Sequence, residues 1–437
     1  MTDTSAPSAV AVQAREPTGA APSPAVAPPP GNPRFPLVDS LRGIAVLCVL
    51  TYHVTAISGA LNRPVIGDLF PVLSNQGLTL FFAISGFLLY RPFVAARRAG
   101  RSGPSLRRYG RRRLLRIVPA YWAALTVLAI FPGIVGVFSG DGWRYYSFLQ
   151  GFSSRTVVSG IPSAWSLSAE VSFYLLLPVW AILIARAHRA LPSARWPRWE
   201  LGLLLAVALG GVAVQVLASR LIVSSLLVTT LLGESTWFAV GMALAVLSVA
   251  AHERPRPPRG LRLIAEHPDL CWLGAIACLI GAVAVLHPGG LFNIIVSLRT
   301  RQPLARTLGS VALTGGFCVL LMAPALFGPP SGGAARRVLA WRPLLLLGLI
   351  SYGVYLYHLT IAELLGESSD PAHFSASGVA LAVHSNHLRT PVLWVATLAV
   401  SVAVATVSYR ALELPLLRRK EPVRAPDEGP RPVPPGP

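Results

Sequence analysis

Two polar side chains interrupt an apolar run near the start of the chain, LRGIAVLCVLTYHV at residues 41–54. Arg42 and His53 are eleven residues apart, close to three helical turns, so on a helix they lie within about 20° of each other. Asp39 lies one turn before Arg42 on the same side. Because arginine inside a membrane helix costs roughly 2.5–3.5 kcal/mol, this stripe must line the bundle interior or a water-filled cavity. There His53 is suited to proton transfer, although a hydrogen bond to a neighbouring helix is the simpler interpretation.

A second polar stripe lies in PSAWSLSAEVSFYLLLPVW, residues 162–180. We expect Glu170 to be the most deeply placed acid of the chain, and a buried carboxylate needs a partner. Glu170 is predicted to hold the imidazole of His53 in one tautomer and to stabilise the imidazolium; a structural polar contact is the alternative. Further substrate-binding candidates in this segment are Ser166 and Tyr174, which share the face of Glu170, and Trp165 near its start.

A basic cluster precedes the third apolar segment, in RRYGRRRLLRIVPAYW at residues 107–122. The charges between Arg97 and Arg108 are interpreted as signals of membrane topology. Arg113 and Arg116 instead lie where a helix enters the membrane, and we expect them to face the interior. Guanidinium groups bind phosphates in bidentate fashion, so this pair predicts a phosphate site.

Two other segments combine polar and small residues within apolar runs. FFAISGFLLYRPF, residues 81–93, contains Ser85 and Gly86, a small pair that lets helices approach closely. ISYGVYLYHL, residues 350–359, places Tyr355 and His358 on one face of a helix, and both are candidates for substrate binding. For both segments, packing is the favoured explanation.

The elements that position these residues are membrane helices. The chain has 437 residues, of which 53% are hydrophobic and only 13% charged, and too few charges remain to cover a soluble protein of this size. Ten apolar segments of about 20 residues are predicted to span a membrane. They are residues 37–58, 72–94, 117–139, 163–186, 200–219, 231–251, 269–287, 305–328, 343–364 and 390–412. The stretch 221–235 either begins the sixth span or lies along the outer surface.

The net charge of +20 is explained by its placement along the chain. If the N-terminus is cytoplasmic, the cytoplasmic connections and tails carry most of the 38 Lys and Arg residues, as the positive-inside rule requires. The prediction is therefore an all-α integral membrane protein of about ten transmembrane helices with both termini cytoplasmic, without a nucleic-acid partner. Residues 1–35 and 419–437 are predicted to be disordered tails, leaving 36–418 as one domain in contact with lipid.

Six segments in this order resemble the acyltransferase-3 family of membrane O-acyltransferases. They are LRGIAVLCVLTYH, GLTLFFAISGFLL, RRRLLRIVPAYW, AWSLSAEVSFYLLLP, LGLISYGVYLYH and SYRALELP, spread between residues 36 and 418. The resemblance implies transfer of an acyl group, usually acetyl, from an acyl-CoA donor to a hydroxyl. It also implies that His53 is the essential base, Arg42 part of the same active-site motif, and Glu170 the acid of the fourth span. Arg113 and Arg116 match the family's basic pair.

Other interpretations remain open from the sequence. A proton-coupled transporter of a small solute also uses buried His, Glu and Arg, and an acyltransferase relative that has lost its activity would be a membrane scaffold. A metal site at three histidines of one connection, His373, His384 and His387, is disfavoured, and we expect no bound metal or permanent cofactor. The hydroxyl acceptor is predicted as a carbohydrate, a glycolipid or a small natural product, without a choice among them.

Overall fold

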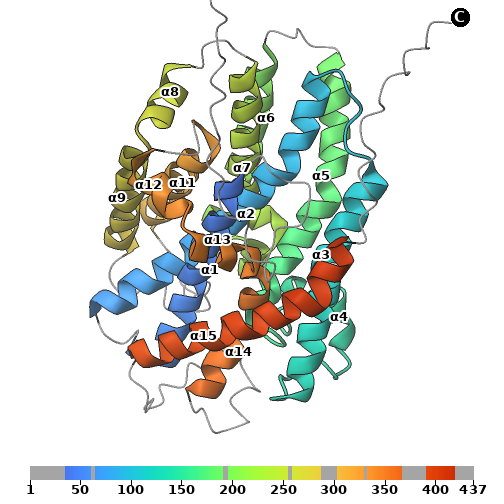
Figure 1. The fold of residues 1–437 in the computed structure, drawn as a ribbon, viewed down its shortest axis with the longest axis vertical. Helices are drawn as coiled ribbons and strands as arrows, with labels where there is room; N and C mark the ends of the chain where they lie inside the picture. Colours follow the sequence, from blue (N-terminus) through green and yellow to red (C-terminus); the bar gives the residue numbers. More distant parts are fainter. Residues whose placement is uncertain are drawn as a thin grey trace, which may run out of the picture.

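The computed structural model describes residues 35–60, 64–189, 195–253, 258–286, 303–328, 332–366 and 390–418, and all regular structure within these ranges is helical. Nine helices are long and apolar enough to cross a membrane in this part of the chain, or ten if one bent pair is a single span. The prediction of about ten spanning helices is confirmed to that extent, and the helices form one bundle (Figure 1).

The long helices are α1 (Pro36–Ile57), α2 (Pro64–Arg98), α3 (Leu106–Ile130), α5 (Trp165–Arg189), α6 (Trp196–Ser219), α7 (Leu231–His252), α9 (Pro268–Leu286), α11 (Leu304–Leu326) and α15 (Thr390–Ser408). The shorter helices are α4 (Gly142–Tyr146), α8 (Arg259–Glu266), α12 (Gly333–Leu339), α13 (Arg342–Leu349), α14 (Ser351–Leu365) and α16 (Leu414–Arg418). Three 3₁₀ segments cover Gln150–Phe152, Pro162–Ala164 and Ser225–Thr229, and a π-helical turn covers Tyr409–Glu413.

The third spanning helix differs from its predicted range, 117–139. It begins eleven residues earlier because Ser105 caps it: the Ser105 hydroxyl accepts a hydrogen bond from the Arg108 N–H at 3.3 Å. The arginine-rich run is therefore helical. The helix ends at Ile130, because the next residue, Phe131, precedes Pro132 and is extended, and a residue before proline disfavours helical angles.

Residues 221–235, for which two placements were predicted, are divided between two elements. Residues Ser225–Thr229 form a 3₁₀ helix, and α7 begins at Leu231 behind Thr230. The Thr230 hydroxyl accepts from the Leu232 N–H at 3.3 Å, which is a standard N-terminal cap. The first part of the stretch is therefore outside the spanning helix.

The ninth predicted span is bent by 79° between α13 and α14. Two glycines bring α13 against α1 at this bend: a Cβ on Gly348 would lie 1.7 Å from the Asp39 carbonyl oxygen, and one on Gly43 would lie 2.7 Å from that of Leu344. Only glycine permits such approaches. Beyond the bend, α14 packs against the second half of α1 in a buried cluster. Because of the bend, α13 packs against the first part of α1 and α14 packs against its second half.

Helix α2 lies in the middle of the bundle and packs most extensively against α7. A Cβ on Gly86 would lie 2.4 Å from the Phe238 carbonyl oxygen, and one on Gly241 would lie 2.0 Å from that of Ala83. The packing role predicted for Gly86 is confirmed. Ser85, the residue before Gly86, lies about 100° around the helix from this contact and faces α5, where it donates to Glu170.

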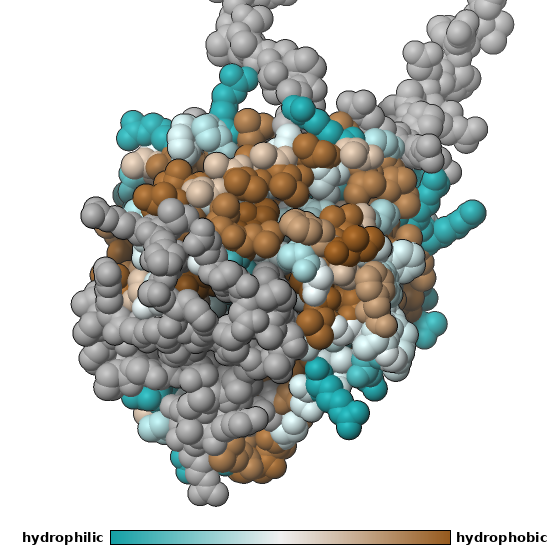
Figure 2. Space-filling model, turned by 90° about the horizontal axis from the view of Figure 1, so that it is seen from below, coloured by the Kyte–Doolittle hydropathy of each residue, from teal (hydrophilic) through white to brown (hydrophobic). Residues whose placement is uncertain are grey.

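The outer surface is apolar around much of the bundle. Large side chains such as Ile130, Leu175 and Val407 are two-thirds or more exposed, and apolar residues cover wide areas of the end view in Figure 2. A soluble protein would not expose so much apolar surface, so this is a multi-pass membrane protein.

Ion pairs join the basic C-terminal end of α2 to α6 and to the end of α7. The Arg97 guanidinium on α2 donates to Glu200 on α6 at 2.5 Å, and that of Arg98 donates to Glu253 at the end of α7 at 2.6 Å. Trp196 on α6 also donates to Glu253, at 3.3 Å. The C-terminal ends of α2 and α7 and the first turns of α6 therefore lie together at one end of the bundle, the top of Figure 1.

Candidate active site

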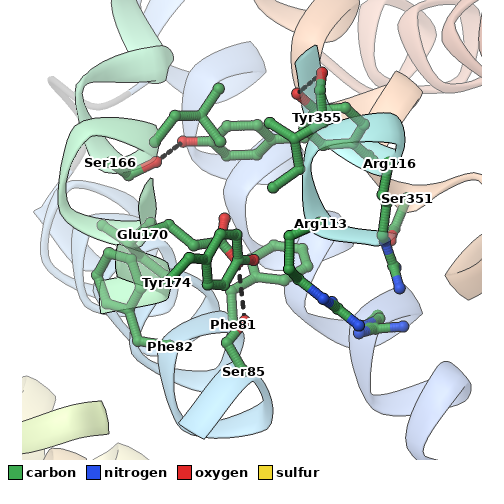
Figure 3. Close-up of a pocket in the computed structure, with 15 residues that line it drawn as sticks. Phe81, Phe82, Ser85, Arg113, Arg116, Ser166, Glu170, Tyr174, Ser351 and Tyr355 are labelled. Atoms are coloured by element: carbon green, nitrogen blue, oxygen red, sulfur yellow. Dashed lines mark hydrogen bonds between the residues drawn. The ribbon is translucent and has the colours of Figure 1, made fainter. Parts of the chain in front are cut away.

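A polar cavity lies between α1, α2, α3, α5 and the bend that leads into α14. It encloses about 650 Å³ of empty space, part of it open to solvent. Seven of the predicted site residues line it: Arg42, Arg113, Arg116, Ser166, Glu170, Tyr174 and Tyr355. Figure 3 shows Glu170 and Tyr174 facing the side chains of Arg113 and Arg116 across this space, which we call the arginine cavity.

The arginine cavity is lined by three arginines and one acid, Glu170, so its charge is positive overall. Arg42 pairs with Asp39 at 3.1 Å, and its side chain is only 13% exposed. The Arg113 guanidinium lies over the Tyr174 ring at 5.9 Å, and its Nε is buried without a hydrogen-bond partner. Neither Arg113 nor Arg116 forms an ion pair with a carboxylate in the described part of the chain. Such a cavity is suited to an anionic ligand.

Glu170 does not contact His53, and this corrects the prediction. Its Oε1 accepts a hydrogen bond from Ser85 at 2.8 Å and another from Tyr174, one turn further along α5. Ser85 therefore joins the site, although only a packing role was predicted for it. Glu170 is also not the most deeply placed acid. Three glutamates of the described ranges are more completely buried, namely Glu200, Glu234 and Glu413, because they lie where helices pack rather than on a cavity wall.

His53 instead pairs with His358 of α14. The His53 Nδ1 and His358 Nε2 atoms are 2.9 Å apart, and the ring centroids are 5.0 Å apart. His358 has no exposed surface. The packing interpretation of His358 is therefore incomplete, since its ring forms a direct polar contact with the predicted base.

The backbone of α14 determines the tautomers of this histidine pair. His358 Nδ1 lies 2.9 Å from the Tyr355 carbonyl oxygen and 3.1 Å from that of Val354. Carbonyl oxygens only accept, so Nδ1 carries the proton, and Nε2 of the neutral ring is an acceptor. His53 must then donate from its own Nδ1, which leaves a lone pair on its Nε2. The pair thus presents His53 in the form that a general base requires.

Tyr355 connects the histidine pair to the arginine cavity. It lies one helical turn before His358 and lines the cavity. Its OH donates to the Ser163 carbonyl oxygen at 2.6 Å and lies 2.7 Å from the Ser166 Oγ, a contact drawn in Figure 3. Arg42 and His53 are separated by about 16 Å along α1, at 1.5 Å per residue. The chain therefore places a cationic cavity and an oriented imidazole along one helix.

Two groups of predicted residues are not part of this arrangement. Trp165 begins α5 but does not line the arginine cavity. The three loop histidines considered as metal ligands, together with the tails 1–34 and 419–437, lie outside the described residues.

The fold and site define a helical membrane protein with an arginine-lined cavity and a pair of hydrogen-bonded histidines. A profile of the acyltransferase domain that defines the acyltransferase-3 family matches residues 36–410, so the chain belongs to that family.

Among its relatives, the chain is 24% identical over 412 residues to the peptidoglycan O-acetyltransferase OatA of Listeria monocytogenes, which covers 87% of this chain and 55% of that protein. It is 26% identical over 178 residues to the O-acetyltransferase OatA of Staphylococcus aureus, covering 37% of this chain and 27% of that protein. It is also 26% identical over 169 residues to the acyltransferase MdmB of Streptomyces mycarofaciens, covering 36% of this chain and 42% of that protein. The chain thus spans about half the length of the Listeria relative and less than half the length of the other two. No solved structure matches it.

Proposed function

We propose that this protein is a membrane O-acyltransferase that moves an acyl group, typically acetyl, from acyl-CoA to a hydroxyl. The acceptor is a cell-envelope carbohydrate, a glycolipid or a glycosylated natural product. The observation that carries the proposal is the placement of the arginine cavity and the histidine pair along one helix. Family membership and relatives named as O-acetyltransferases support the reaction class. The distribution of basic residues supports cytoplasmic termini.

The donor binds with its phosphates in the arginine cavity. Arg113 and Arg116 hold the pyrophosphate by charge-assisted hydrogen bonds, and Arg42 faces the same space. The pantetheine arm of coenzyme A has about twelve bonds between pyrophosphate and sulfur. Extended chains advance about 1.1–1.2 Å per bond, so the arm spans roughly 14 Å. This length is close to the separation of Arg42 and His53 along α1, and the thioester therefore reaches the imidazole.

His53 acts as the general base. Its Nε2 takes the proton of the acceptor hydroxyl while the hydroxyl oxygen attacks the thioester carbonyl carbon. The carbon–sulfur bond then breaks, and the leaving thiolate takes the proton from the imidazolium, giving an ester and free coenzyme A. Proton transfer by a positioned side chain contributes roughly 10²- to 10⁴-fold. His358 keeps the His53 ring in the required tautomer through the 2.9 Å contact.

The proposal is tested with the full-length protein in membrane vesicles supplied with acetyl-CoA labelled in its acetyl group. Labelled ester and free coenzyme A are expected to form together when envelope extract is added. Mass spectrometry of glycans and small metabolites from a deletion strain then identifies the acceptor by its missing acyl group. A proton-coupled transporter would leave acetyl-CoA intact, and a protein without affinity for coenzyme A would contradict the proposal.

Removing Arg113 or Arg116 is predicted to weaken donor binding. Arg113→Gln and Arg116→Gln should each raise the Kd for coenzyme A about 10- to 100-fold, because each removes a charge-assisted phosphate contact of about 1.5–3 kcal/mol. Titration calorimetry in detergent measures the change. Arg112→Gln is the matched control, since Arg112 is exposed on the same helix and does not line the cavity. Equal affinities in all three variants would show that the pair has no part in donor binding.

Glu170→Gln is predicted to change donor affinity more than turnover. Glutamine retains an oxygen that accepts from Ser85 and Tyr174, but it removes the negative charge that faces the donor phosphates. Coenzyme A should therefore bind about two- to tenfold more tightly, by Coulomb interaction in a partly solvated site. A loss of turnover above 100-fold at unchanged affinity would restore the predicted catalytic role of Glu170.

A further inference from the structure

A second pocket lies at the basic end of the bundle, where the last turns of α2 and α5 meet the connection 99–105 and the start of α3. It encloses about 1240 Å³ of empty space, part of it open to solvent. Its basic residues are Arg97, Arg101, His188 and Arg189, and none of its thirteen lining residues is an acid. We call it the basic pocket; nothing in the mechanism above uses it.

Its arginines are in two different states. Arg97 donates to the fully buried Glu200 at 2.5 Å, and Glu200 also accepts from the Tyr90 OH, so Arg97 is both fixed and neutralised. Arg101 and Arg189 are exposed and form no ion pair with any carboxylate in the described ranges. The basic pocket therefore keeps two positive charges without a balancing acid, which favours a phosphate group.

The other wall of the basic pocket is apolar. The ring of Phe93 and the side chains of Ala181 and Ile182 line it. A free phosphate would leave this wall uncovered, whereas a ligand that combines a phosphate with a flat, weakly polar ring covers both walls. A phosphorylated nucleoside has this combination.

The basic pocket and the arginine cavity are aligned along the same helices. On α5, Tyr174 lines the cavity and Ala181 the pocket; on α3, Arg113 lines the cavity and Leu106 the pocket. Both pairs are seven residues apart, or about 10.5 Å along a helix. Tyr109 lies between the two sites: its OH donates to the Tyr174 carbonyl oxygen at 3.2 Å, and its ring contacts a phenylalanine of the pocket at 5.8 Å. A single elongated ligand can therefore occupy both.

We infer that the basic pocket binds the adenosine and 3′-phosphate of the acyl-CoA donor, with Arg101 and Arg189 contacting that phosphate. The inference rests on the proposed function, because it extends the same ligand from the arginine cavity. It assigns the pyrophosphate to the cavity and the nucleoside end to the pocket. The pantetheine arm then runs from the cavity toward His53, in the opposite direction.

The test compares coenzyme A with 3′-dephospho-coenzyme A as probes. Full-length protein is held in nanodiscs of phosphatidylcholine, and Kd values are measured by calorimetry. The wild type should bind coenzyme A about tenfold more tightly than the dephosphorylated probe, the equivalent of one good phosphate contact. The Arg101→Gln, Arg189→Gln double variant should bind both probes equally, at the wild-type affinity for the dephosphorylated one. Arg186→Gln is the control, since Arg186 is exposed on α5 outside the pocket and should behave as wild type.

The outcomes separate this inference from the proposed function. If the wild type binds coenzyme A but the double variant keeps the wild-type preference for the 3′-phosphate, the inference is overturned and the proposed function stands. If the wild type binds neither probe, both are overturned. A third measurement adds phosphatidylglycerol to the nanodiscs. If the double variant retains less of this lipid than the wild type does, and binds coenzyme A with wild-type affinity, the pocket binds a lipid headgroup and the inference is again overturned.

Discussion

His53→Ala should lose acyl transfer while the protein remains folded in the membrane. The variant keeps the arginine cavity but has no group at the position of His53 Nε2, so the acceptor hydroxyl keeps its proton as it attacks. We expect the turnover number to fall about 10²- to 10⁴-fold, the usual contribution of a positioned general base. The rate of ester formation from labelled acetyl-CoA measures the loss. The Kd for coenzyme A should stay within about twofold, because the phosphates bind three turns away along α1.

The matched control for this variant is His267→Ala. His267 follows α8 and is exposed, and among the residues that the structure describes it forms hydrogen bonds only through its backbone. It should keep wild-type turnover and affinity at equal expression. A His53→Ala protein with at least a tenth of wild-type turnover would remove the base from the proposed mechanism. Loss of coenzyme A binding in the same variant would indicate a collapsed site instead.

Helix positions and the cavity-lining residues could be predicted from sequence because they follow from local periodicity. The four-residue spacing of Ser166, Glu170 and Tyr174 places them on one face of α5, and all three line the arginine cavity. Arg42 was placed in the interior because lipid would not accept it. These inferences need only the geometry of one helix and the cost of burying a charge.

Contacts between helices were predicted less well because they depend on how the helices pack. His53 was assigned to Glu170, yet α14 brings His358 to it. That approach depends on the 79° bend after α13 and on the Gly348 contact with the Asp39 backbone. Hydrophobic periodicity reports neither a bend nor a register between helices. The only sequence signal was the position of His358 on one face with Tyr355, and it equally suited simple packing.

His358 should act as a positioning residue, and its variants separate that role from packing. His358→Ala removes the side-chain acceptor for the His53 Nδ1 proton and leaves only the Val49 carbonyl bonded to the ring, so the tautomer with its proton on Nε2 becomes more populated. That tautomer cannot act as a base. The turnover number should fall about 10²- to 10³-fold, less than the roughly 10⁴-fold loss on changing the orienting acid of a soluble triad, because His358 is a neutral partner. The KM for acetyl-CoA should be nearly unchanged, since His358 does not line the arginine cavity.

Replacing His358 with glutamine or with asparagine tests which of its ring nitrogens is required. Glutamine can place an acceptor oxygen near the position of His358 Nε2, whereas asparagine reaches only the position of Nδ1. His358→Gln should therefore recover about tenfold of the turnover lost in His358→Ala, and His358→Asn should recover none. A purely structural role predicts similar losses for both amides, with a lower melting temperature in each.

Combining the variants tests whether the two histidines act as a unit. The His53→Ala, His358→Ala double variant should be only slightly slower than His53→Ala alone, because a positioning residue has no function once the base is absent. If the two losses multiplied instead, His358 would contribute independently of His53. The 2.9 Å contact between the rings would then be a packing contact, and the tautomer of His53 would have to be determined by a group on the acceptor itself.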